Sequence, residues 1–206
     1  SYASVGSGWA NASSTPYRYY KQYTHEGGVK TPLIVHYPAG LTLPPGTMSP
    51  LAGYITDILP TCAELAGATY PTERNGEAIM PMEGASLLPL FKGVERPNRP
   101  IIIEHEDSKA LRDGDWKIVQ ERGGQPWELY NLAADPTEIH DLADREPERV
   151  KAMATTWNAW AQRVGLKKGE PKAVHGTIDL QPGKPLAGAE APAIANEPLR
   201  FQATLR

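Results

Sequence analysis

Two stretches carry apolar residues at the spacing of an amphipathic helix. In residues 147–164 this spacing follows Pro147, which suits the first helical position. Residues 53–67 repeat the pattern, with Asp57 as the expected N-cap and Gly67 as the expected C-cap glycine. The predicted apolar faces are Val150, Met153, Ala154, Trp157, Trp160, Ala161 and Val164 in the longer helix, and Ile58, Leu59, Cys62, Leu65 and Ala66 in the shorter one.

Residues 101–130 alternate in the manner of short strands. Three consecutive isoleucines at 101–103 favour a strand, and residues 110–119 predict a hairpin around an Asp-Gly turn at Asp113. Residues 127–130 predict a further strand, so the region is expected to form a small antiparallel sheet. In the second hairpin arm one face would carry Trp116, Ile118 and Gln120, and the other Lys117 and Val119.

The first third of the chain has a different pattern. Residues 1–20 are small and polar, then aromatic, without a clear period, which predicts a loop and a chain that begins within a larger fold. Residues 29–37 contain the apolar run Leu33-Ile34-Val35, typical of a strand buried on both faces. Residues 84–91 predict a short helical or turn segment.

Composition narrows the function classes. A net charge of −3 over 206 residues gives no electrostatic case for nucleic acid. No apolar run approaches the ~20 residues of a membrane span, and residues 1–10 do not resemble a signal peptide. The single cysteine, Cys62, is expected to be a small core residue. One cysteine cannot form an internal disulfide, so the sequence does not decide between a cytoplasmic and a periplasmic or secreted protein.

A Pro- and Arg-containing linker at residues 93–100 predicts a boundary between two structural units. The segment after this linker would hold the predicted sheet and the long helix. Residues 167–206 are rich in Pro, Gly and Ala and predict a tail.

Lys21 is the first candidate for chemistry. It lies five residues before Glu26 and the pair Gly27-Gly28. It is either an ordinary surface lysine or a cation held near an anionic ester, whose oxygens suit a compact ammonium. The two glycines would allow either a close backbone approach or a turn with positive φ.

The second candidate is the acidic run around His105. Glu104, His105, Glu106 and Asp107 resemble a metal or acid–base site, but alternation along a strand would point Glu104 and Glu106 away from His105. A polar sheet edge is the alternative. The other histidines show no metal-ligand spacing, and the sequence contains no nucleophile elbow, Walker loop or dinucleotide fingerprint.

Five segments, taken in order, resemble the type I sulfatase family and favour an arylsulfatase. The most specific is Lys21, four residues, Glu26-Gly27-Gly28 and then an apolar run ending in a turn. The others fall at residues 8–18, 56–68, 84–90 and 104–136, so the resemblance covers about residues 8–164. It implies an alkaline-phosphatase-like α/β fold, in which residues 1–96 would be the C-terminal part of the large domain. Residues 97–166 would form a small α+β C-terminal subdomain of antiparallel strands packed on a helix.

The resemblance also implies a function: a parent sulfuric ester hydrolase acting on a small sulfate ester. Lys21 would contact the sulfate group and the leaving oxygen, and His105 would lie near the substrate mouth. The family uses formylglycine and a divalent cation, usually Ca²⁺. The formylglycine motif, Cys or Ser followed by x-Pro-x-Arg, is absent, since Ala-Glu-Leu follows Cys62, and no residue here is assigned to the metal.

The chain is therefore expected to be inactive alone and to complete its site with an upstream part of the same sulfatase. Apolar surface would be exposed around residues 33–35 and near Ile58 and Leu65, where that upstream part or a second copy would contact it. Two other classes remain open: a phosphate or phosphonate ester hydrolase of the alkaline phosphatase superfamily, and a non-catalytic structural or interaction domain.

Overall fold

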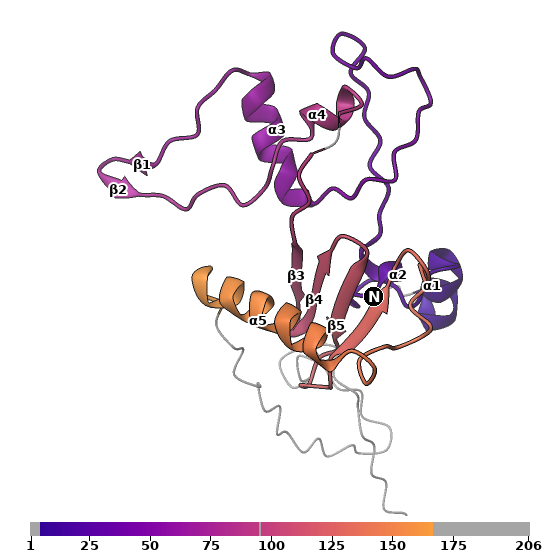
Figure 1. Cartoon of the computed structure of the whole chain (residues 1–206). Helices are drawn as coiled ribbons and strands as arrows, with labels where there is room; N and C mark the ends of the chain where they lie inside the picture. The colour runs from indigo at the N-terminus through magenta and orange to yellow at the C-terminus, as the bar shows by residue number, and fades with distance from the viewer. Residues whose placement is uncertain (1–4, 95, 167–206) are drawn as a thin grey trace, which may run out of the picture. The chain divides into compact units, whose positions relative to one another are not determined.

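The structure is a computed structural model that describes residues 5–94 and 96–166 (Figure 1). The helices are α1 (Gly6–Ser14), α2 (Glu26–Val29), α3 (Ile58–Leu65), α4 (Leu88–Phe91) and α5 (Pro147–Arg163), with a 3-10 turn, η1 (Ile55–Asp57), directly before α3. The strands are β1 (Glu73–Arg74), β2 (Glu77–Ala78), β3 (Ile101–His105), β4 (Ser108–Asp113), β5 (Trp116–Gln120) and β6 (Glu128–Asn131). The predicted tail at residues 167–206 lies outside the described residues.

Strands β3 to β6 form an antiparallel sheet in the order β3-β4-β5-β6, as the alternation of residues 101–130 predicts. The hairpin between β4 and β5 pairs Asp113 with Trp116 and turns through Gly114, whose φ is 58°. That left-handed conformation suits glycine and explains the Asp-Gly signal.

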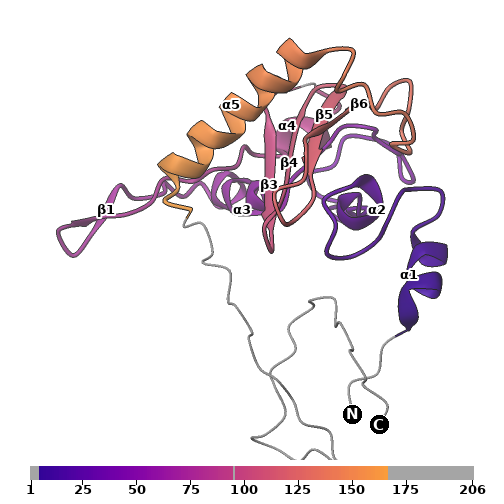
Figure 2. The same ribbon diagram turned by 90° about the horizontal axis from the view of Figure 1, so that it is seen from below.

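Helix α5 covers one face of this sheet, and α2 lies on the other side (Figure 2). The core under α5 joins three sheet residues to three helix residues: Leu111, Ile118, Leu129, Met153, Trp157 and Ala161. Trp157 is 3% exposed, and its indole Nε1 donates to the carbonyl oxygen of Ile103 at 3.1 Å. The predicted stripe of α5 and the predicted facing of β5 are therefore confirmed.

The predicted strand at residues 29–37 is wrong in this structure. Val29 ends α2, and the residues that follow it up to Tyr37 adopt neither helix nor strand. A strand needs a neighbour to pair its backbone N–H and C=O groups, and none of the described strands pairs with this segment. Leu33 and Ile34 are 59% and 90% exposed, so the expected exposure of apolar surface here is confirmed.

The predicted loop at residues 1–20 is also wrong, because α1 occupies Gly6–Ser14. This helix buries none of its residues, and without a buried face it has no apolar stripe for the sequence to display.

The helix predicted at residues 53–67 forms as η1 and α3, but the expected core position of Cys62 is wrong, because Cys62 is exposed. Ile58 and Leu65 are 40% and 44% exposed, so the expected exposure of apolar surface near them is confirmed. The helix instead buries Pro60 and Thr61, because the Thr61 hydroxyl accepts a 2.8 Å hydrogen bond from the Leu87 amide next to α4. A small polar contact thus replaces the apolar one that periodicity favours.

Asp57 precedes α3 at its N-cap position, as predicted, but its side chain does not cap this helix and accepts hydrogen bonds from other groups. Its carboxylate accepts the amides of Tyr54 at 3.0 Å and Ala85 at 2.9 Å, and it pairs with Arg96 and Arg99. Burial works to raise the pKa of Asp57, but these hydrogen bonds and the two guanidinium groups outweigh burial and lower it.

The division at residues 96 and 97 stays a prediction. Within the described ranges, no helix has both the length and the apolar character required to cross a membrane.

Candidate functional site

Lys21 lies on a tight turn formed by residues 19–23. Two non-glycine residues of this turn have positive φ, Tyr19 at 63° and Gln22 at 88°, and the amide of Tyr23 donates to the carbonyl of Tyr20 at 3.1 Å. The Lys21 side chain is exposed, and among residues 5–94 and 96–166 it has no hydrogen-bond or ion-pair partner. The turn therefore presents an ammonium group with its charge unneutralised.

The pair Gly27-Gly28 allows the turn to lie directly on α2. A Cβ on Gly27 would stand 2.2 Å from the carbonyl oxygen of Tyr19, and one on Gly28 would stand 2.0 Å from that of Tyr23. Neither glycine has positive φ. Of the two roles that the sequence leaves open for this pair, the structure shows the close backbone approach.

Aromatic rings hold the conformation of the turn. Tyr19 and Tyr23 stack at 4.2 Å between centroids, and Tyr20 meets Tyr23 edge-on at 5.4 Å. Burial raises the pKa of the Tyr23 phenol above its ordinary value. The ring contacts join residues on both sides of Lys21.

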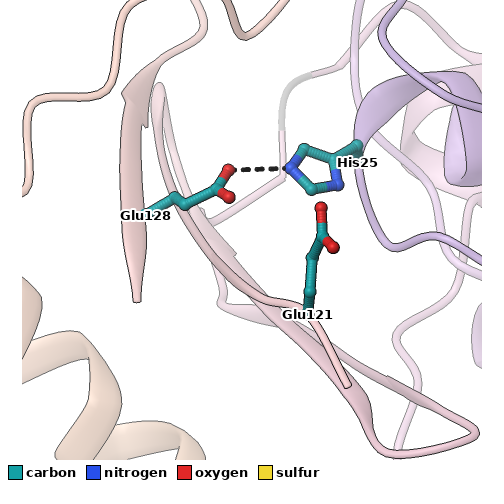
Figure 3. Close-up of side chains that lie close together, drawn as sticks. All are labelled: His25, Glu121 and Glu128. Atoms are coloured by element: carbon teal, nitrogen blue, oxygen red, sulfur yellow. Dashed lines mark hydrogen bonds and ion pairs between the residues drawn. The ribbon is translucent and has the colours of Figure 1, made fainter. Parts of the chain in front are cut away.

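A partly buried polar cluster joins Arg18 and His25, which flank the turn, to strand β6, and Figure 3 shows its contact between His25 and Glu128. His25 is fully buried, and its Nε2 lies 2.9 Å from Glu128 Oε2. Arg18 donates to the same oxygen at 3.2 Å and to the Tyr130 hydroxyl at 2.6 Å, and that hydroxyl donates to Glu128. Burial opposes ionisation of Glu128, but hydrogen bonds from His25 and Tyr130, with the nearby charge of Arg18, lower its pKa overall.

His25, Glu121 and Glu128 are the described residues whose potential ligand atoms lie within 4.8 Å of one another. They do not fit a calcium ion, which takes six to eight oxygen ligands. His25, Arg18 and Tyr130 already surround the nearest carboxylate oxygen of Glu128. The cluster is a hydrogen-bonded network that connects the residues on either side of the turn to β6.

Glu26 and Lys117 form a second buried polar cluster with Glu138. Lys117 Nζ lies 2.9 Å from Glu26 Oε1 and 2.7 Å from Glu138 Oε1, although only the first contact has hydrogen-bond geometry. The sequence places Lys117 on the sheet face away from α5 but does not identify its partners. A lysine between apolar neighbours in a buried strand could have indicated that Lys117 needs a buried anionic partner.

His105 ends β3 and is exposed. In the part of the chain that the structure describes, no hydrogen bond or ion pair joins it to the Lys21 turn. The carboxylates around it serve the local hairpin instead: Glu104 accepts the Asp107 amide at 3.0 Å, and Glu106 pairs with Arg122 at 3.1 Å. The polar sheet edge, the simpler of the two sequence interpretations, accounts for this run.

Comparisons with known proteins agree on one family. The family described as N-sulphoglucosamine sulphohydrolase, C-terminal, matches residues 16–159, more than two thirds of the chain. An uncharacterized sulfatase of Schizosaccharomyces pombe is 29% identical over 168 residues, 78% of this chain and 30% of that protein. The choline-sulfatase of Rhizobium meliloti is 33% identical over 134 residues, 61% of this chain and 24% of the relative.

The arylsulfatase K of Xenopus laevis is 30% identical over 148 residues, 66% of this chain and 26% of that protein. The chain thus spans about a quarter to a third of the length of these curated relatives. The crystal structure titled Ps i-CgsB superimposes with a TM-score of 0.57 at 24% identity, over 71% of this chain and 32% of that one. This likeness confirms the alkaline-phosphatase-like α/β fold class. The chain belongs to the sulfatase family and carries that family's C-terminal region.

Proposed function

We propose that this chain is the C-terminal part of an arylsulfatase-type sulfuric ester hydrolase, and that Lys21 binds the sulfate group of its substrate. The observation that supports this role is an exposed, unneutralised ammonium on a fixed turn, inside the region that matches the sulfatase family. The turn is held in place because the glycine pair packs against its carbonyls and Glu26 ties α2 to Lys117 of the sheet.

The chemistry expected of Lys21 is electrostatic. Its ammonium would contact a sulfate oxygen and the ester oxygen that joins sulfur to the leaving group. Negative charge grows on that ester oxygen as the S–O bond breaks, and a positioned cation stabilises the transition state more than the ground state. Lys21 would thereby raise the rate most for alcohols and phenols that leave poorly.

Sulfatases generally use formylglycine and a divalent metal ion, which supply the nucleophile and neutralise the sulfate. In this protein we propose that the ion is Ca²⁺ and that both groups are held by an upstream part of the same sulfatase. The exposed apolar side chains of Leu33, Ile34, Ile58 and Leu65 offer a surface for that part. His105, on the exposed end of β3, is proposed to border the substrate entrance.

The test compares p-nitrophenyl sulfate hydrolysis by this chain alone, by the complete protein, and by its Lys21→Ala and Lys21→Arg variants. The chain alone should show no turnover. Lys21→Ala in the complete protein should lower kcat/KM by about 10²-fold or more, the scale of a lost transition-state contact. Lys21→Arg should retain part of the rate because it keeps the charge but changes its geometry.

An unchanged rate in Lys21→Ala would refute the role of Lys21, and turnover by the chain alone would refute the need for an upstream part. Faster hydrolysis of p-nitrophenyl phosphate than of the sulfate by the complete protein would instead favour a phosphate ester hydrolase. Absence of both activities in the complete protein would favour a non-catalytic domain.

A further inference from the structure

The sheet face opposite α5 carries a buried charge cluster where α2 meets the sheet. Glu26, Lys117 and Glu138 are each at least 95% buried in their side chains. They come from three separate parts of the sequence: the start of α2, the second residue of β5 and the segment after β6. The cluster therefore fixes α2 onto the sheet.

The charges of this cluster are nearly balanced. Lys117 lies between two carboxylates, and the more exposed Lys30 approaches the second oxygen of Glu26 at 3.7 Å. Buried ion pairs of this kind are a weak source of stability, since desolvation offsets most of the attraction. Their directional contacts do, however, select one placement of the groups they join.

Backbone contacts of α2 with the Lys21 turn make the position of the turn depend on the position of α2. The amide of Glu26 donates to Glu138 Oε2 at 2.6 Å, so two bonds fix the first residue of α2. The next amide, that of Gly27, donates to the carbonyl of Arg18 at 2.9 Å. Because the two glycines lie against the carbonyls of the turn, a shift of α2 must move the turn with it.

We propose that Lys117 is a positioning residue for Lys21: held between Glu26 and Glu138, it sets where α2 lies and so where the ammonium of Lys21 meets the ester oxygen. This role rests on the proposed function of Lys21. Lys117 itself, at 1% exposure, does not contact substrate. It would influence the rate only through the position of the turn.

The test uses the complete protein and a series of substituted phenyl sulfates whose phenols differ in pKa. Lys117→Met keeps the length of the side chain and removes its charge, leaving two carboxylates facing each other. We expect kcat/KM to fall by about 10- to 10²-fold, the range that a misplacement near 1 Å can cause. The loss should grow as the phenol becomes a poorer leaving group, as it should in Lys21→Ala.

Met153→Ala is the matched control, because Met153 lies on α5 and is buried against the opposite face of the same sheet. It weakens the fold without touching the cluster, so its dependence on leaving-group pKa should match the wild type. The double variant Lys21→Ala, Lys117→Met should be no slower than Lys21→Ala alone, because both changes act through one ammonium. Glu138→Gln provides the same measurement should Lys117→Met fail to fold.

The outcomes separate the two proposals. If Lys21→Ala keeps the wild-type rate, the proposed function of Lys21 fails. If Lys21→Ala is slow but Lys117→Met and Glu138→Gln show the leaving-group dependence of Met153→Ala, the positioning role alone fails. Losses that multiply in the double variant would likewise overturn it.

Discussion

Replacing Gly28 by alanine would place a methyl group inside the contact between α2 and the Lys21 turn. The added Cβ would lie 2.0 Å from the carbonyl oxygen of Tyr23 and 2.7 Å from that of Tyr20. Ordinary contacts of this kind begin near 3.4 Å, so backbone atoms must move apart by more than about 1 Å. Overpacking of this size costs about 1–3 kcal/mol.

Gly8 provides the matched control for this substitution. It lies within α1, its φ is not positive, and a Cβ there meets nothing within 4 Å. Gly8→Ala should therefore stabilise the chain by about 0.4–1 kcal/mol through reduced entropy of the unfolded state. The same chemical change is thus expected to have opposite signs at the two positions.

Urea unfolding of the 206-residue chain, followed by far-UV circular dichroism, measures both changes in unfolding free energy. Gly28→Ala should also speed hydrogen exchange at the Tyr23 and Gly27 amides, which donate to the carbonyls of Tyr20 and Arg18 respectively. Equal stability of Gly28→Ala and Gly8→Ala, with unchanged exchange at these amides, would refute the close-approach role of the glycine pair.

Two further predictions concern the rest of the fold. Trp157→Ala should lower the unfolding free energy by about 3–5 kcal/mol, because it leaves a cavity in the core under α5. Trp9→Ala, at a side chain that is 75% exposed, should change the unfolding free energy by less than about 0.5 kcal/mol. Similar effects of the two substitutions would contradict the packing of α5. Asp57 and Glu128 have lowered pKa values in the folded chain, so their contribution to stability is present above the ordinary carboxyl pKa of about 4 and is lost as pH falls through their folded values. The urea concentration at the unfolding midpoint, measured from pH 7 to pH 3, should decrease once the pH is below about 4, and Asp57→Asn should make this decrease smaller. A midpoint that does not change with pH in the wild type would show that these contacts do not favour the ionised forms.

The parts of the fold that the sequence predicts are those whose signals are local. Alternation in β4 and β5 indicates which side chains face α5, and the turn at Gly114 fixes the register between them. The stripe of α5 can likewise be predicted, because the helix face that packs on a sheet is mostly apolar. Each of these patterns is complete within about twenty residues.

The support of the candidate site could not be predicted in this way. Glu26 lies 91 residues before Lys117 and 112 residues before Glu138, and nothing in their local sequence indicates that the three meet. Cys62 shows the opposite error: helical period alone assigned it to a core, while the actual burial of α3 follows Thr61 and its bond to the Leu87 amide. Periodicity gives a helix two faces but does not say which neighbour each face will have.

By itself, the sequence determined the small sheet, the covering helix, the family and the lysine that carries the proposed chemistry. Only the tertiary structure decided that Lys21 is exposed and without a partner among the described residues, and that Gly27 and Gly28 serve a close approach. It also decided that the run at residues 33–35 forms no strand, because a strand exists only where a neighbour pairs its backbone. Local patterns specify the elements; the long-range contacts that place Lys21 become visible only when those elements are packed.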